Sequence, residues 1–212
     1  MKQPPAILYY FHDPMCSWCW GFKKAFQQLC ENLPEGILVK HVLGGLAPDS
    51  DEPMPVELRQ QIKSGWLRIE AMIPGVTFNF DFWQKCQPRR STYAACRAVI
   101  AARQQGEQYD VLMTNAIQDA YYQQARNPSD DETLIALAAE LGIDRQRFVD
   151  DFCSHEVKTM LQQEIDFSRH MFVESFPSLV LKVENKTSGI EIDYTDYATM
   201  LKQIREILNA VY

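Results

Sequence analysis

The sequence of 212 residues has little positive charge. Its 28 aspartates and glutamates outnumber its 21 lysines and arginines, so the formal net charge is -7. Nucleic acids and anionic membrane surfaces are bound by clustered lysine and arginine, and here Arg89-Arg90 is the only adjacent pair of arginines. We therefore expect neither a nucleic acid nor a membrane among the partners.

The sequence also lacks a long apolar run. No segment approaches the roughly 20 apolar residues that span a bilayer. Residues 1–5 lead into the first apolar segment without the apolar core of a secretory signal. From these absences we expect a cytoplasmic protein; nothing in the sequence specifies an oligomeric state.

Cysteine is sparse and scattered, which excludes the dense disulfide framework of a small secreted domain. The six cysteines stand at positions 16, 19, 30, 86, 96 and 153. Cys16 and Cys19 form the one Cys-x-x-Cys pair, which in a cytosolic protein is typical of catalysis or metal binding. The other four are expected to pack as small apolar side chains, because free cysteine behaves as a small hydrophobe.

The Cys-x-x-Cys pair is predicted to lie where a strand meets a helix. An apolar run at residues 7–11 precedes it, and the helical spacing of Phe22, Phe26 and Leu29 follows it. The unpaired N–H groups and the dipole at a helix N-terminus stabilise a thiolate on the first cysteine. Cys16 is therefore the expected nucleophile, and Cys19, on the same helix face, can close a disulfide with it.

Along the rest of the chain, the spacing of apolar residues changes twice, from that of a strand to that of a helix and back. Residues 36–43 indicate a second strand, buried on both faces, before a polar loop at residues 46–55. Helical spacing of apolar residues then predominates to about residue 171. Within this segment Ser129 and Glu132 form a capping box, and residues 148–171 follow a single helical pattern. Residues 176–183 and 190–193 indicate two more strands before a last helix.

This order predicts a thioredoxin-like domain from residues 1–50 and 172–212, with residues 51–171 as an inserted helical domain. Pro177 opens the third strand, as expected of a residue that lacks a ladder donor. A cis bond there would leave the backbone of Phe176 free to pair with an extended chain. Trp18, between the cysteines, is expected to be partly exposed and to contact a substrate.

These features together resemble the DsbA family of the thioredoxin superfamily. The motifs of the resemblance are residues 13–22 (DPMCSWCWGF), 44–48 (GGLAP), 78–80 (FNF), 88–93 (PRRSTY) and 176–178 (FPS). They are most similar to DsbA-like protein-disulfide isomerases without an export signal. The resemblance implies an α/β thioredoxin fold (βαβ…ββα) with a helical domain inserted before the third strand.

The resemblance also implies roles for individual residues. Cys16 is implied as nucleophile, Cys19 as resolving thiol and Pro177 as the cis-proline facing them. We expect a thiol–disulfide oxidoreductase or disulfide isomerase that contacts substrates through Trp18, Phe176 and Pro177. Its partners would be protein or small-molecule thiols and disulfides, with glutathione as a candidate co-substrate and with no cofactor beyond the redox-active disulfide.

Other interpretations remain open for the pair and for the function. Cys153 and His155 could complete a zinc site with Cys16 and Cys19, although we expect no metal. A glutathione-dependent transferase of the kappa type shares this architecture but normally has serine at the position of Cys16. A binding module whose cysteines form only a redox-sensitive clasp is the third possibility.

Three further features have two interpretations each. The aromatic residues 78–83 line an apolar groove near the disulfide or pack between domains. The two arginines Arg89-Arg90 either hold a carboxylate of glutathione or are simply two solvated cations. His12 tunes the thiolate of Cys16 or is a histidine at a strand end without that role.

Overall fold

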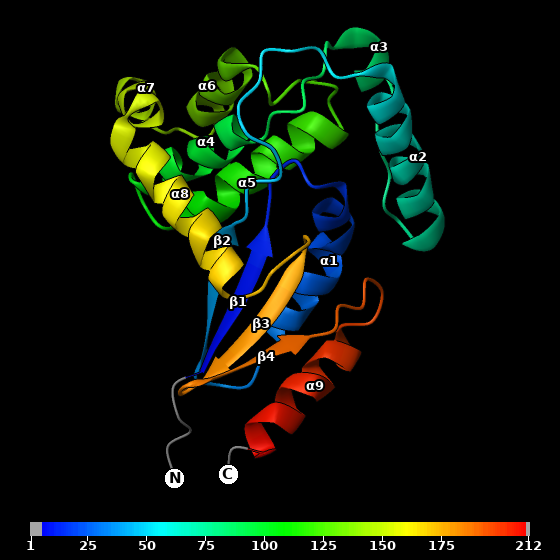
Figure 1. Cartoon of the computed structure of the whole chain (residues 1–212), viewed down its shortest axis with the longest axis vertical. Helices are drawn as coiled ribbons and strands as arrows, with labels where there is room; N and C mark the ends of the chain where they lie inside the picture. Colours follow the sequence, from blue (N-terminus) through cyan, green and yellow to red (C-terminus); the bar gives the residue numbers. More distant parts are fainter. Residues whose placement is uncertain (1–5, 211–212) are drawn as a thin grey trace.

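The computed structural model describes residues 6–210, which form a four-stranded sheet with helices at one end and on both faces (Figure 1). None of these helices is long and apolar enough to cross a membrane. The strands are β1 (Ala6–His12), β2 (Ile37–Leu43), β3 (Ser178–Val183) and β4 (Lys186–Ile190). The helices are α1 (Ser17–Glu31), α2 (Val56–Met72), α3 (Phe82–Lys85), α4 (Tyr93–Arg103), α5 (Gln108–Tyr122), α6 (Asp131–Glu140), α7 (Arg145–Cys153), α8 (His155–His170) and α9 (Tyr197–Ala210).

The sheet has the order β2-β1-β3-β4. β1 runs parallel to β2 and antiparallel to β3, which in turn is antiparallel to β4. Because side chains alternate along a strand, Leu8 and Tyr10 of β1 pack on one face while Tyr9 and Phe11 pack on the other. The α/β class and the βαβ…ββα order of a thioredoxin fold are confirmed.

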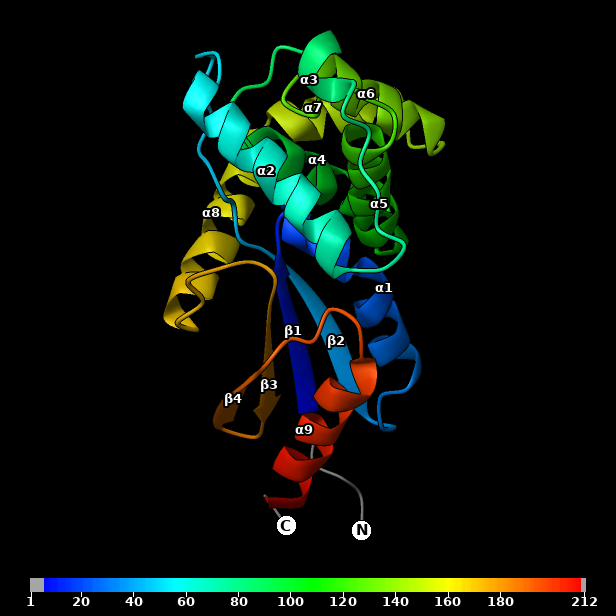
Figure 2. The ribbon, with the colours of Figure 1, turned by 90° about the vertical axis from the view of Figure 1, so that its right-hand side faces the viewer.

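Helices cover the two faces of the sheet unequally. α1 and α9 pack on one face, where Leu8, Phe22 and Ile204 belong to the same buried cluster (Figures 1 and 2). The other face is covered by Phe167 in the C-terminal part of α8 and by Met171 directly after this helix. The sheet therefore holds β1, and with it the start of α1, in a fixed position.

The helices α2 to α8 follow one another between β2 and β3, and all but the C-terminal part of α8 lie beyond the end of β1 that leads into α1 (Figures 1 and 2). Their centre is the alanine-rich α4, whose small side chains permit close approach of the neighbouring helices. The fully buried residues of α4 are Ala95, Cys96, Ala98, Val99, Ile100, Ala101 and Ala102. The division of the chain into domains at 50/51 and 171/172 stays a prediction.

Two strand predictions were wrong in detail. β2 is an edge strand and Leu38 is 55% exposed, so β2 is not buried on both faces. β4 occupies Lys186–Ile190 rather than 190–193, because the chain turns directly after β3 with Glu184 at a φ of +53°. A turn this tight leaves the polar residues after it to pair with β3.

Two helix predictions were also wrong. Ser129 does not cap α6, because its hydroxyl donates to the Ser91 carbonyl and the helix begins two residues later. The pattern over residues 148–171 is split at Ser154, whose side chain accepts from the Val157 amide and so starts α8. Periodicity alone does not reveal this break, because apolar residues recur at helical spacing on both sides of it.

Candidate active site

Cys16 is the N-cap residue of α1, at the end of the sheet where β1 leads into the helix. The Cys19 amide donates a hydrogen bond to Cys16 Sγ at 3.3 Å. A sulfur in this position accepts an N–H group that has no partner within the helix, and it lies at the positive end of the helix dipole. Cys16 is 5% exposed and Cys19 is fully buried, so a reagent reaches Cys16 first.

The loop before β3 faces the two cysteines. The Phe176–Pro177 peptide bond is cis, as the resemblance implied. The Cys16 thiol lies 3.4 Å from the Phe176 carbonyl oxygen, to which it donates a hydrogen bond. The structure thus brings Cys16, Cys19, Phe176 and Pro177 together, although 160 residues separate Cys16 from Phe176.

The two thiols have different electrostatic surroundings. Burial raises the pKa of the Cys19 thiol well above its ordinary value, and the neighbouring Cys16 sulfur raises it further. Cys19 is therefore protonated at neutral pH until a reaction at Cys16 changes its surroundings. This asymmetry suits a nucleophile at Cys16 and a second thiol that reacts later.

Asp13 is a structural part of this site to which the sequence analysis gave no role of its own. Its buried carboxylate accepts hydrogen bonds from the Met15 amide, the Leu46 amide and the Thr92 hydroxyl, each at 2.7 or 2.8 Å. Burial raises the pKa of Asp13, and these hydrogen bonds oppose the rise. Asp13 therefore ties the loop before Cys16 to the start of α4. Thr92 follows Asp13 by 79 positions, so no local sequence signal predicts this bond.

Comparison with known proteins identifies the family of this chain. The family model for thioredoxin matches residues 9–203. The chain belongs to the thioredoxin family. A solved structure of a candidate protein disulfide isomerase from Nitrosomonas europaea is similar over 99% of each chain. Its TM-score is 0.83 and its sequence is 27% identical.

Two further comparisons carry different names. The cytosolic disulfide reductase DsbM from Pseudomonas aeruginosa has a TM-score of 0.76 at 23% identity, covering 96% of this chain and 99% of that one. The ClpXP adapter protein SpxH from Halalkalibacterium halodurans is 23% identical over 196 residues, which are 90% of this chain. The thioredoxin-family chain spans 63% of the length of that SpxH.

The residues between and beside the cysteines join the thioredoxin-like part to the helices beyond it. Ser17 Oγ accepts a hydrogen bond from Trp66 Nε1 of α2 at 2.9 Å. Trp18 is half-buried, as predicted, with its ring 5.2 Å from that of Tyr194 and with the Arg68 guanidinium 5.7 Å away. Part of the Trp18 ring therefore remains available to a bound molecule.

Gly44 shapes the other side of the site. A Cβ placed on Gly44 would lie 1.8 Å from Cζ of the Phe176 ring, so this glycine leaves room for the ring to pack. The φ of Gly44 is not positive, so alanine is compatible with its backbone and only the space is lacking. Gly44 thereby fixes the position of the residue whose carbonyl faces Cys16.

We expect Gly44→Ala to destabilise the protein by about 1–3 kcal/mol and to lower turnover, because the methyl group expels the Phe176 ring. In a Phe176→Ala background the same substitution should cost less than about 0.5 kcal/mol, since no ring remains to be displaced. Urea unfolding of the four proteins of this double-mutant cycle measures the coupling. Equal costs in the two backgrounds would contradict the packing argument.

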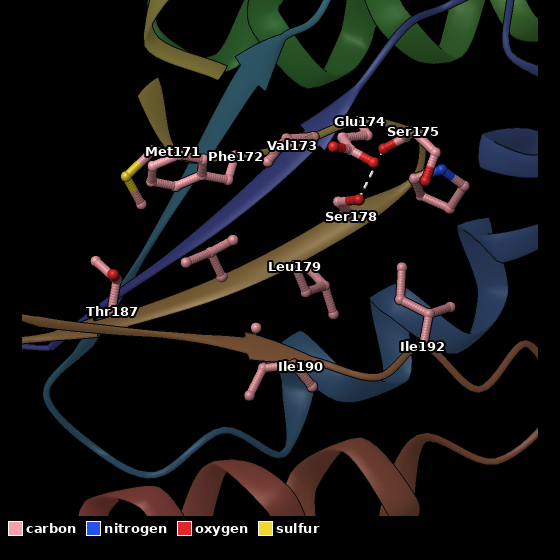
Figure 3. Close-up of a pocket in the computed structure, with 13 residues that line it drawn as sticks. Met171, Phe172, Val173, Glu174, Ser175, Ser178, Leu179, Thr187, Ile190 and Ile192 are labelled. Atoms are coloured by element: carbon pink, nitrogen blue, oxygen red, sulfur yellow. Dashed lines mark hydrogen bonds between the residues drawn. The ribbon is translucent and has the colours of Figure 1, made fainter. Parts of the chain in front are cut away.

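A groove of 550 Å³ adjoins Pro177 on the side of the open strand edge (Figure 3). It lies between the loop 171–175 and the strands β3 and β4, with Leu179, Ile190 and Ile192 in its lining. Phe172, at its rim, is 91% exposed. This groove offers an extended chain a place to lie next to the cis-proline.

The remaining candidate residues are used elsewhere. Phe78 and Phe82 of the aromatic segment are buried and pack against Trp66, so the packing interpretation of residues 78–83 is supported. Arg89 forms an ion pair with Asp130 at 2.7 Å, which occupies its guanidinium.

The zinc interpretation of the Cys-x-x-Cys pair has no support in the geometry. Within residues 6–210, Cys16 and Cys19 belong to no group of three or more side chains that could hold a metal ion, and Cys153 lies exposed at the end of α7.

His12 is buried and stacks on Tyr10, with ring centroids 4.7 Å apart. Its ring lies 5.4 Å from that of His41 on β2.

Proposed function

We propose that this chain is a thiol–disulfide oxidoreductase or disulfide isomerase that acts through Cys16 and Cys19. One observation carries the proposal: Cys16 Sγ caps α1 at 3.3 Å from the Cys19 amide, and it faces the Phe176 carbonyl beside a cis-proline. The two sulfurs are thus placed one helical turn apart with unequal exposure. This is the arrangement that stepwise thiol–disulfide exchange requires.

The exchange takes two steps. The Cys16 thiolate attacks one sulfur of a substrate disulfide, the S–S bond breaks, and the other substrate sulfur leaves as a thiolate. Cys19 then loses its proton and attacks Cys16 Sγ, which forms the Cys16–Cys19 disulfide and releases the second substrate thiol. Two electrons pass from the cysteine pair to the substrate, and external thiols restore the pair.

The surroundings of the pair support an extended protein substrate. The groove beside Pro177 lies next to the strand edge at β4, where a chain can run alongside the loop that carries Phe176 (Figure 3). The half-buried Trp18 between the cysteines and the exposed Phe172 in the lining of the groove supply apolar surface. An isomerase needs such a surface because it must hold partly folded chains.

Glutathione is the external thiol that the comparisons support. DsbM, a cytosolic disulfide reductase with a similar fold, is also known in a structure with GSH, at a TM-score of 0.74 and 21% identity. A cytoplasmic location would make reduction or isomerisation the net reaction, because the cytosolic thiol pool is reducing. The kappa-type transferase is less well supported, since Cys16 stands where that class has serine.

A protein-binding function is the second candidate. Sequence similarity to a ClpXP adapter protein extends over 90% of this chain, and the exposed Phe172 at the rim of the groove suits a protein contact. In that function the cysteine pair would act as a redox-sensitive clasp. Turnover of a disulfide substrate distinguishes the two candidates.

The test is reduction of insulin with glutathione as the thiol. We expect the wild-type protein and Cys153→Ser to accelerate the reaction equally, because Cys153 is exposed and remote in the chain from the pair. Cys16→Ser should not exceed the rate with glutathione alone. Equal rates for wild type and Cys16→Ser would exclude the oxidoreductase and leave the binding function.

A further inference from the structure

A cluster of buried polar groups without partners lies where β1, β2 and α5 meet. His12 is 0% exposed, and neither of its ring nitrogens has a hydrogen-bond partner within residues 6–210. In the same described part of the chain, Nδ1 of His41 and Oδ1 of Asp110 are also buried and without a partner. A buried polar group without a partner destabilises the fold, so a cluster of them calls for an explanation.

The unpaired atoms converge on one point. One ligand atom from each of His12, His41 and Asp110 lies within 4.8 Å of the others, and His41 Nδ1 is 3.6 Å from the Asp110 carboxylate. Zinc bonds of about 2.0–2.2 Å in a tetrahedron place ligand atoms about 3.4 Å apart. The separation between His41 and Asp110 is already near this value, and small side-chain rotations would bring in His12.

Two carboxylates and the guanidinium that pairs with both line the same cavity as His41. Asp110 and Glu164 carry two negative charges against the single positive charge of Arg103, which pairs with both. Arg103 binds Oδ2 of Asp110 at 3.1 Å, so the unpaired Oδ1 remains directed at the histidines. An arginine in this position orients the carboxylate in the way that outer-shell groups orient metal ligands.

A simple ion pair between His41 and Asp110 does not explain the cluster. His41 Nδ1 and Asp110 Oδ1 are 3.6 Å apart, and an ion pair between them would leave both ring nitrogens of His12 without a partner in the described part of the chain. Neutral imidazole nitrogens and a carboxylate oxygen are the donors that zinc accepts. A cavity of 720 Å³ lined by His41, Arg103, Asp110 and Glu164 gives an ion and its water a route to them.

We propose that His12, His41 and Asp110 bind one divalent metal ion, Zn²⁺ as the probe of choice, with water at the remaining position. The ion would tie the end of β1, which leads into the redox pair, to β2 and α5. The site uses neither Cys16 nor Cys19 and does not depend on the proposed function.

The test uses the full chain with Cys16→Ser and Cys19→Ser, which removes the thiols that could bind zinc by themselves. Equilibrium dialysis with metal analysis should find one Zn²⁺ per chain, and Zn²⁺ should raise the melting temperature. His41→Gln and Asp110→Asn should each weaken binding by at least about 10-fold and abolish the rise. His155→Gln, at an exposed histidine of α8, is the matched control and should bind as its parent does.

Cobalt supplies a second measurement. Co²⁺ in place of Zn²⁺ should give visible absorption bands without thiolate-to-cobalt charge transfer, because the ligands are nitrogen and oxygen. Circular dichroism verifies that each variant is folded, and if His41→Gln unfolds, Asp110→Asn carries the comparison. No Zn²⁺ bound by the double serine parent, or equal binding by Asp110→Asn and His155→Gln, would overturn the proposal.

Discussion

Cys19→Ser should convert the protein into a trap that accumulates mixed disulfides with its substrates and with glutathione. Cys16 remains at the N-terminus of α1 and still attacks, but the second thiol that would release the substrate is missing. Cys16→Ser should accumulate none, because the buried Cys19 is protonated and covered at neutral pH. Both variants should lose turnover by more than about 100-fold, as expected when either member of a catalytic unit is removed.

Mass spectrometry after acid quenching measures the trapped species. Cys153→Ser and Cys30→Ser serve as controls, since they remove a thiol without touching the pair, and they should show the wild-type pattern. Trapping by Cys16→Ser instead of Cys19→Ser would mean that the two roles are exchanged. Absence of trapping in both variants would exclude thiol–disulfide exchange at this site.

Trp66→Ala should be the most destabilising of the single substitutions considered, at about 3–5 kcal/mol. Trp66 is fully buried, stacks on Phe78 at 4.8 Å between centroids and meets Tyr122 edge-on at 5.6 Å. Its indole N–H also donates to Ser17 Oγ, next to the nucleophile. The substitution therefore removes a large apolar contact and a link between α2 and the start of α1.

Urea or thermal unfolding measures this loss, and for a chain of this length each kcal/mol lowers the melting temperature by about 2–4 °C. Leu67→Ala is the matched control. Leu67 is the next residue of α2 and is 54% exposed, so its replacement should change the stability by less than about 0.5 kcal/mol. Trp66→Phe retains most of the ring contacts and should cost less than Trp66→Ala. A cost for Trp66→Ala no larger than that for Leu67→Ala would contradict the packing described above.

Local sequence patterns were enough to predict the parts of the fold that local physics decides. The apolar run before Cys16 and the periodic residues after it located β1 and α1. Pro177 was placed at the head of the third strand because proline has no backbone N–H to donate, and its cis bond was expected from the family resemblance. Apart from the resemblance, each of these signals lies within a few residues of the feature that it predicts.

The features that the sequence analysis missed depend on contacts between distant residues. The bond from Thr92 to Asp13 and the convergence of His12, His41 and Asp110 exist only once β1, β2 and the helices are assembled. The capping role given to Ser129 failed for the same reason, since its hydroxyl instead reaches the Ser91 carbonyl. A local rule is overridden whenever tertiary structure offers the group a different partner.

The most direct test of the central claim is equilibration of the purified protein with mixtures of reduced and oxidised glutathione, followed by mass analysis. We predict reversible formation of a Cys16–Cys19 disulfide, with a midpoint between about -270 mV and -120 mV, the range spanned by thioredoxin and DsbA. Peptide mapping should place the bond between these two residues and leave Cys30, Cys86, Cys96 and Cys153 reduced. A pair that stays reduced in every mixture, or a disulfide that forms elsewhere in the chain, would contradict the account.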